Sequence, residues 1–119
     1  MAFFSVIIPL YNKENFIENT IQSVLDQTFE DFEIIVINDG STDKSEEKLL
    51  QFKDSRIRYY SKNNEGVSIT RNLGITLTNA NFVAFLDADD YWYQDFLKVM
   101  FDYCTRFVKA KVFTTAIEV

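Results

Sequence analysis

The segment 32–37 constrains the fold most, because it is apolar at nearly every position. Its sequence, Phe-Glu-Ile-Ile-Val-Ile, would bury side chains on both faces of a strand. Strands of this kind are typical of parallel sheets that are covered by helices on both sides. Further strand patterns alternate with stretches of helical periodicity, which predicts a doubly wound, mostly parallel α/β sheet with right-handed crossovers. The expected strands are residues 3–8, 32–37, 57–60 and 82–86, and the expected helices are residues 13–27, 44–52, 66–78 and 95–108.

Several residues are expected to mark the ends of these elements. Pro9 cannot donate a hydrogen bond to a neighbouring strand, so it should end the first strand. Asn12 is the expected N-cap of the first helix, and Asp43 with Glu46 has the spacing of a capping box at the second. Residues 111–119 should open a fifth strand.

The composition is that of one globular domain. The chain has 119 residues, of which 47% are hydrophobic and 25% are charged, and this length can bury a core. A net charge of −6 argues against a nucleic-acid-binding surface. The sequence has neither an apolar stretch of membrane-spanning length nor a signal-peptide pattern. We therefore expect a cytoplasmic protein, which could lie peripherally at the inner face of the membrane.

The residue types that are missing exclude several chemistries. The chain has no histidine, which removes histidine general bases, Ser-His-Asp and Cys-His nucleophiles and histidine-bound zinc. The one cysteine, Cys104, cannot form an internal disulfide and is expected to be a small buried hydrophobic residue. Any chemistry must therefore rely on carboxylates, hydroxyls, cations or a metal ion.

An acidic cluster follows the expected strand 82–86. The sequence Asp-Ala-Asp-Asp at residues 87–90 places three carboxylates at the C-terminal end of a buried strand, where they would repel one another. A bound Mg²⁺ or Mn²⁺ would offset this repulsion, because hard cations prefer oxygen ligands and often bridge carboxylates to phosphates. The alternative is a turn followed by a helix N-terminus, since aspartate favours both.

Polar loops gather at one edge of the predicted sheet. Residues 9–12, 38–41 and 87–90 each follow a strand, and residues 63–66 lead into a helix at the same edge. Ligands bind outside the carboxyl ends of the strands in open α/β sheets, so we expect the site here. Helix-end and loop amides could receive a diphosphate. The glycine-rich Rossmann and P-loop motifs are absent from the sequence.

Four motifs, in order, resemble those of the family 2 glycosyltransferases, which have a GT-A fold. The motifs are Ser-Val-Ile-Ile-Pro-Leu-Tyr-Asn at 5–12, Ile-Asn-Asp-Gly-Ser-Thr-Asp at 37–43, Asn-Glu-Gly-Val-Ser-Ile-Thr-Arg-Asn-Leu-Gly at 64–74 and Phe-Leu-Asp-Ala-Asp-Asp at 85–90. The resemblance implies a GT-A fold of the nucleotide-diphospho-sugar transferase type. It also implies a nucleoside-diphosphate sugar donor and favours a UDP-sugar.

The resemblance assigns roles to individual residues. Asp87 would face the ribose of the donor, and Asp89 would bind Mn²⁺ or Mg²⁺ against the diphosphate. Asp39 matches an aspartate that accepts a hydrogen bond from the nucleobase, typically uracil. The remaining substrate-binding residues implied by the resemblance line the nucleotide pocket, and they are Pro9, Tyr11, Glu14 and Arg71.

The same residues also have structural alternatives. Tyr11 could be a capping aromatic residue, the Asp-Gly pair at 39–40 is common in turns, and Arg71 could be a solvated helix charge. Trp92 and Tyr93 are candidates for an acceptor pocket, with core or rim packing as the alternative.

The resemblance implies inverting transfer of the sugar to a glycan or lipid-linked acceptor in the synthesis of polysaccharide or cell-surface glycans. The general base of the family lies well beyond the Asp-x-Asp motif, and we find no candidate for it here, because Glu118 is too early and lies in an expected strand. We therefore expect residues 1–119 to form a single, partial nucleotide-sugar-binding domain without the C-terminal half of the fold. The alternative function is a non-catalytic nucleotide-sugar-binding or assembly module.

An exposed sheet edge should make the 119-residue chain self-associate. Without the second half of the fold, the fifth strand and part of a sheet face would be uncovered, and aromatic residues make up 16% of the chain. Such surfaces find partners, so we expect a symmetric homodimer by light scattering. We also expect no sugar transfer without the general base. A dilute monomer would contradict the first expectation, and acceptor-dependent product the second.

Overall fold

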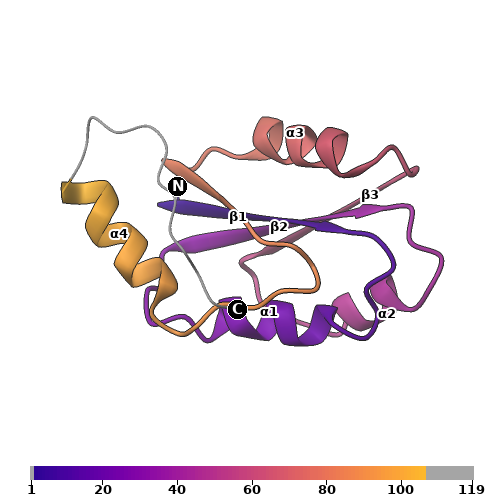
Figure 1. Ribbon diagram of the computed structural model, residues 1–119, viewed down its shortest axis with the longest axis horizontal. Helices are drawn as coiled ribbons and strands as arrows, with labels where there is room; N and C mark the ends of the chain where they lie inside the picture. The colour runs from indigo at the N-terminus through magenta and orange to yellow at the C-terminus, as the bar shows by residue number, and fades with distance from the viewer. Residues whose placement is uncertain (1, 107–119) are drawn as a thin grey trace.

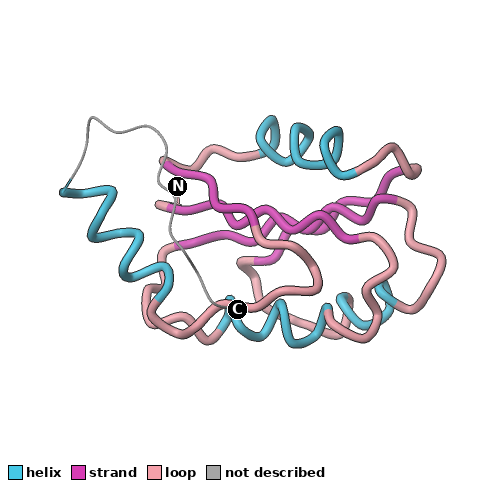
Figure 2. The backbone as a smooth tube through the Cα atoms, in the orientation of Figure 1, coloured by secondary structure: helices cyan, strands magenta, loops and turns pink. Residues whose placement is uncertain are grey.

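The computed structural model of the protein describes residues 2–106. Within this range one central sheet lies between helices, as Figures 1 and 2 show. The strands are β1 (Phe4–Leu10), β2 (Phe32–Asp39), β3 (Ile57–Lys62) and β4 (Phe82–Phe85), and the helices are α1 (Ile17–Leu25), α2 (Ser45–Leu49), α3 (Val67–Leu77) and α4 (Phe96–Arg106). The strand order is β3-β2-β1-β4 and every pairing is parallel, which confirms the predicted doubly wound sheet.

Apolar side chains are buried on both faces of the sheet. On the face covered by α1 and α2, Val6, Ile8 and other strand residues join the helix residues in the larger core cluster. On the opposite face, Ile7, Ile35 and Ile37 are fully buried beneath α3. Successive strand residues therefore alternate between two cores, which explains why the central strands are apolar at consecutive positions.

The fourth helix, α4, lies toward the end of the sheet at which β1 begins (Figure 1). Phe101 of α4 packs against Phe3 and Phe29, with ring centroids 4.8 and 4.7 Å apart. Cys104 on the same helix is buried, as predicted, and burial raises the pKa of its thiol. Helix α4 therefore extends the core away from the edge where the polar loops gather.

Pro9 lies inside β1, so the prediction that it ends the strand is wrong. It lies opposite Ile37 of β2 in the parallel register. The carbonyl of Ile7 accepts a hydrogen bond from the N–H of Leu86 at 3.0 Å, so it faces the β4 side. Backbone groups two residues further on face the same side, and β4 ends at Phe85, opposite Ile7. The missing N–H of Pro9 therefore faces a position beyond the end of β4, where proline is tolerated.

The first helix begins at Ile17 rather than at residue 13, and Asn12 is not its N-cap. Asn12 has a φ of 50°, a left-handed conformation that asparagine tolerates better than most residues, whereas an N-cap normally has an extended backbone. Its Oδ1 instead accepts a hydrogen bond from the N–H of Thr42 at 2.8 Å. A tertiary contact therefore replaces the expected local cap.

The capping box predicted at the second helix does not form. Asp43 accepts a hydrogen bond from the N–H of Ser45 at 2.9 Å, and Glu46 accepts one from the hydroxyl of Tyr59 at 2.7 Å. Asp43 therefore bonds the first N–H of α2, but Glu46 does not return the bond, and α2 spans Ser45–Leu49 rather than the predicted 44–52. The predicted fifth strand, 111–119, lies outside the described residues. No helix within residues 2–106 combines the length and apolarity needed to cross a bilayer.

Helix α3 approaches β1 closely because Gly74 has no side chain. A Cβ atom at this position would lie 2.6 Å from Cγ2 of Ile7, which is fully buried. Real carbon atoms do not approach so closely, so any larger residue must push the helix from the sheet.

We expect Gly74→Val to lower the free energy of unfolding by about 1–3 kcal/mol, the usual cost of overpacking a core. Ile75→Val is the control on the same helix, because Ile75 is half exposed and should change the free energy by less than about 0.5 kcal/mol. Chemical denaturation measures both variants. Equal stabilities for the two would show that α3 is not held at this distance by Gly74.

Candidate functional site

A pocket opens where the loops after β1, β2 and β4 meet the first turn of α3. It has a volume of about 360 Å³, and we call it the rim pocket. Its lining residues are Pro9, Leu10, Tyr11, Lys13, Asp39, Val67, Arg71, Asp87, Ala88 and Asp89. The fold thus brings together six of the seven site residues predicted from the sequence. The seventh, Glu14, does not line the rim pocket.

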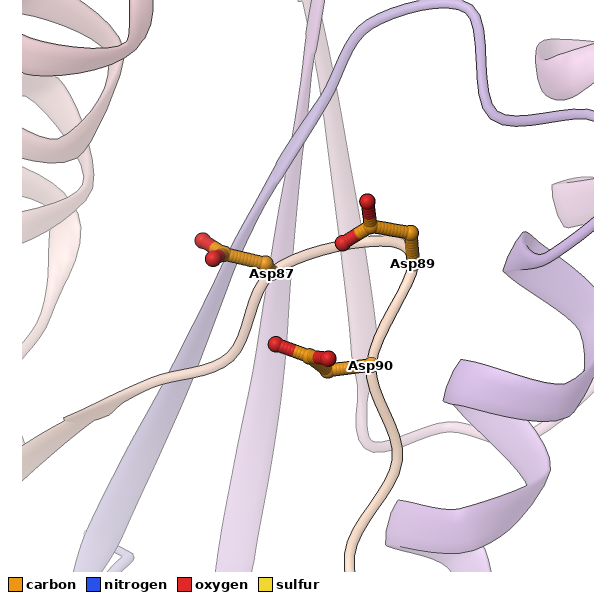
Figure 3. Close-up of side chains that lie close together, drawn as sticks. All are labelled: Asp87, Asp89 and Asp90. Atoms are coloured by element: carbon orange, nitrogen blue, oxygen red, sulfur yellow. The ribbon is translucent and has the colours of Figure 1, made fainter. Parts of the chain in front are cut away.

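Three carboxylates form an acidic cluster at the rim pocket, and two of them, Asp87 and Asp89, line the pocket itself. Asp87, Asp89 and Asp90 lie on one bend of the loop after β4, with carboxylate oxygens within 4.8 Å of one another (Figure 3). Burial, together with the negative charges of Asp89 and Asp87, raises the pKa of the Asp90 carboxyl. The cluster therefore carries the mutual repulsion that the sequence predicts, and a cation placed among the oxygens would relieve it.

The predicted turn in this loop is present, but no helix follows it directly. The N–H of Asp90 donates to the carbonyl of Asp87 at 3.0 Å, which closes the turn. The hydroxyl of Thr20 on α1 donates to the carbonyl of Ala88 at 2.9 Å and so attaches the loop to α1. The next helix, α4, begins only at Phe96. The carboxylates are therefore held by a turn and a tertiary contact, without a helix N-terminus to stabilise them.

Two side-chain cations already lie against this acidic cluster. Arg71 Nη2 is 2.9 Å from Asp87 Oδ1, and Lys13 Nζ is 3.3 Å from Asp89 Oδ2. Arg71 Nε is buried and has no hydrogen-bond partner within residues 2–106. Arg71 therefore forms an ion pair at the pocket rather than being a freely solvated helix charge.

Asp39 lies on the opposite side of the pocket, and its carboxylate is 5% exposed. Its Oδ1 accepts hydrogen bonds from Lys62 Nζ at 2.8 Å and from the N–H of Glu65 at 2.9 Å. Its Oδ2 accepts from the N–H of Gly66 at 3.0 Å and from Asn64 Nδ2 at 3.3 Å. Burial alone would raise the pKa of Asp39, but the hydrogen bonds from Lys62, Glu65 and Gly66 outweigh it and hold the pKa below the ordinary 3.8.

The Asp-Gly pair at 39–40 is also a turn, as the structural alternative predicts. Gly40 has a φ of 77°, and a Cβ atom there would lie 2.7 Å from the backbone nitrogen of Asn64. Asn38 supports the turn by accepting a hydrogen bond from the N–H of Ser41 at 3.0 Å. The segment 39–40 is therefore both a turn and part of the pocket wall. Glycine is needed at position 40 because a side chain there would collide with the loop that carries Asn64.

Side-chain hydrogen bonds fasten the loop after β1 to the loop after β2. The N–H of Asn12 donates to the Ser41 hydroxyl at 3.0 Å, and Asn12 Oδ1 accepts from the N–H of Thr42 at 2.8 Å. The N–H of Glu14 donates to Asp43 Oδ2 at 3.1 Å. Glu14 thus helps to join the two loops and does not line the rim pocket.

The two aromatic candidates for an acceptor pocket differ in burial. Trp92 is buried, stacks on Phe96 with a centroid distance of 4.4 Å, and donates its backbone N–H to the Ser23 hydroxyl at 3.1 Å. Tyr93 is 58% exposed. Trp92 also borders a second hollow of about 360 Å³ between α1 and residues 91–94. Trp92 therefore has a packing role, and a contact with an acceptor stays a prediction for both.

Sequence reasoning missed Lys13 and Lys62. Lys13 lines the rim pocket, and Lys62 forms the ion pair with Asp39. Lys13 directly follows the motif at 5–12, and this position in the sequence could have predicted that it lies in a loop at the site. Lys62 ends β3, and only the pairing of β3 with β2 brings it opposite Asp39.

Comparison with known proteins identifies the class of the fold and then the family. The N-terminal part of TarS from S. aureus, solved in complex with UDP-GlcNAc, superposes with a TM-score of 0.82 at 30% sequence identity, covering 87% of this chain and 31% of that one. This likeness confirms the GT-A glycosyltransferase fold. The sequence model of glycosyl transferase family 2 matches residues 5–114. The chain belongs to that family.

Two relatives show how much of a longer protein the chain corresponds to. An uncharacterized glycosyltransferase of Rickettsia bellii is 50% identical over 97 residues, which are 80% of this chain and 14% of the relative. WfgD of Escherichia coli, a UDP-Glc:alpha-D-GlcNAc-diphosphoundecaprenol beta-1,3-glucosyltransferase, is 40% identical over 89 residues, which are 74% of this chain and 35% of WfgD. The chain therefore spans a minor part of the length of each.

We expect Asp39→Ala to lower the free energy of unfolding by about 1–2 kcal/mol at neutral pH, because the N–H groups of Glu65 and Gly66 lose their acceptor. The pKa of Asp39 is lowered in the folded protein, so its contribution is present above pH 3.8 and is lost as the pH falls below that value. The stability difference between wild type and variant should thus narrow in acid.

Urea denaturation at neutral pH and below pH 3.8 measures this difference. Asp102→Ala on α4 is the control, because Asp102 forms an exposed ion pair with Lys98 and no contact with the pocket. A difference for Asp39→Ala that stays constant across the pH range would contradict the assigned pKa direction.

Proposed function

We propose that this chain is the donor-binding part of an inverting glycosyltransferase that uses a UDP-sugar. The observation that carries the proposal is the rim pocket, in which Asp39, Arg71 and two members of the acidic cluster, Asp87 and Asp89, line a single hollow. Membership of glycosyl transferase family 2 supports transfer from a nucleotide sugar. The likeness to TarS, solved with UDP-GlcNAc, supports uridine as the nucleoside.

The acidic cluster fits a divalent metal ion. Asp87, Asp89 and Asp90 each offer a carboxylate oxygen, and such an all-oxygen set suits Mn²⁺ or Mg²⁺. In this proposal Asp89 is the metal ligand and Asp87 faces the ribose. A bound ion would stabilise the negative charge of the leaving diphosphate.

The nucleobase would lie between Tyr11 and Asp39. Tyr11 is 47% exposed at the pocket, so its ring is available for stacking on a base. The Asp39 carboxylate already accepts four hydrogen bonds, of which the 3.3 Å contact from Asn64 is the longest. We infer that the N3–H of uracil replaces this contact, which leaves the shorter bonds from Lys62 and the backbone intact.

The acceptor is proposed to be a glycan or a lipid-linked saccharide, as the name of WfgD describes for that relative. Inverting transfer requires a carboxylate base that removes the proton of the acceptor hydroxyl. We assign no residue within 2–106 to that role. The second candidate function is a nucleotide-sugar-binding module without turnover, which the same pocket would serve. A transfer assay on the protein, compared with donor binding, separates the two.

Removing the proposed metal ligand should abolish the metal dependence of nucleotide binding. We expect wild-type protein to bind UDP at least about ten-fold more tightly with Mn²⁺ than with EDTA, because repulsion by the acidic cluster is offset by the ion. Asp89→Asn should reduce this ratio to near one. Isothermal titration calorimetry measures the ratio for both proteins.

Asp102→Asn is the matched control, since it removes one exposed, ion-paired carboxylate on α4 and should leave the ratio unchanged. Equal affinity of the wild-type protein for UDP in Mn²⁺ and in EDTA would rule out the metal site. Binding of adenosine and uridine diphosphates with equal affinity would rule out base selection by Asp39.

A further inference from the structure

We propose that Lys13 is a mobile counter-cation, which pairs with Asp89 in the metal-free site and transfers to the donor diphosphate when the metal binds. The inference rests on the proposed function and deepens it. It gives a role to a residue that none of the sequence motifs assigns. It also predicts that metal and diphosphate bind cooperatively.

The contact between Lys13 and Asp89 is of a kind that is easily broken. Lys13 Nζ lies 3.3 Å from Asp89 Oδ2, and the two side chains are 38% and 41% exposed. This distance is longer than that of a strong charge-assisted hydrogen bond. Exposed pairs of this kind contribute little free energy, because water and salt screen them. A divalent cation with the same oxygen as its ligand would therefore displace the ammonium group.

The backbone of Lys13 is fixed while its side chain is not. Its N–H donates to the hydroxyl of Ser45 at 2.9 Å, and the preceding residue, Asn12, is held by Thr42. Within residues 2–106, the ammonium group has Asp89 as its partner. The side chain can therefore swing within the rim pocket, which it lines, without disturbing the loop.

Lys62 shows the contrasting arrangement on the other side of the pocket. Its ammonium group lies within 2.9 Å of three acceptors, on Asp39, Asn63 and Glu65, and its side chain is 13% exposed. Three short contacts use all three donors of an ammonium group. Lys62 is therefore locked in place, and of the two lysines only Lys13 is free to follow a ligand.

Charge balance gives the reason for a transfer. A metal ion at Asp89 would place a double positive charge beside the ammonium group, and like charges repel. A diphosphate in the same pocket offers Lys13 new oxygen partners. Lys13 should thus oppose binding of the metal alone and favour the metal with the diphosphate. Such a difference is a positive coupling free energy between the two ligands.

The test compares Mn²⁺ alone, uridine and UDP with Mn²⁺ on wild-type protein and Lys13→Met. We expect the variant to bind Mn²⁺ alone about two- to five-fold more tightly, because an exposed ion pair no longer competes. Its affinity for UDP in the presence of Mn²⁺ should fall by a factor of about ten or more, since a charged donor to phosphate is lost. Its affinity for uridine, which has no phosphate, should not change.

Lys98→Met on α4 is the matched control, because it also removes one lysine charge from an exposed pair, with Asp102 at 3.4 Å. Lys13→Arg keeps the charge and should restore most of the UDP affinity. Electron paramagnetic resonance of free Mn²⁺ measures the metal, calorimetry measures the nucleotides, and thermal unfolding by circular dichroism verifies that each variant is folded.

The transfer of Lys13 is supported if Lys13→Met binds Mn²⁺ alone more tightly and UDP with Mn²⁺ more weakly than the wild-type protein. It is overturned if Lys13→Met has the wild-type affinity for Mn²⁺, or if Lys98→Met loses as much affinity for UDP as Lys13→Met does. If wild-type protein binds Mn²⁺ but no UDP, the proposed function and the diphosphate partner of Lys13 both fail. The Mn²⁺ titration then still decides whether Lys13 shields Asp89. If UDP binds and Lys13→Met changes neither ligand, only the inference about Lys13 fails.

Discussion

The in-register pairing of β1 with β2 is the constraint on which the rest of the structure depends. Leu10 lies opposite Asn38, so both strands end at the same level and their loops leave the sheet side by side. Burial on both faces of the sheet stabilises this pairing. The adjacent residues Ile7 and Ile8, for example, are buried in different core clusters on opposite faces. A shift of one residue would exchange the two faces and separate the loops that build the rim pocket.

The rim pocket contains carboxylates in two different environments. Asp39 is buried and saturated by hydrogen bonds from Lys62 and the backbone, so it stays ionised and rigid. Asp87 and Asp89 are exposed and each is paired with one cation, Arg71 or Lys13. The first arrangement is suited to recognising a fixed hydrogen-bonding pattern, and the second to exchanging one cation for another. One site can thus combine a rigid half and an adaptable half.

Local sequence patterns predicted the elements well and their ends poorly. The strands and the α3 and α4 helices lie close to their predicted positions, since burial of apolar residues decides where they form. Local preferences gave the wrong roles to Pro9 and Asn12, and they predicted a capping box between Asp43 and Glu46 that does not form. In the folded chain, Pro9 faces a position past the end of β4, and Asn12 and Asp43 are used to fasten neighbouring loops.

The sequence by itself determined the parallel α/β sheet, the edge at which the site forms and most of the residues that line it. Apolar runs and motif spacing carry that information along the chain, and parallel strands bring their carboxyl ends to one edge. Only the tertiary structure decided that Lys13 and Lys62 pair with Asp89 and Asp39, and that Glu14 helps to join two loops and does not line the rim pocket. These contacts join residues far apart in sequence, so strand register and loop packing fix them, and no local pattern encodes them.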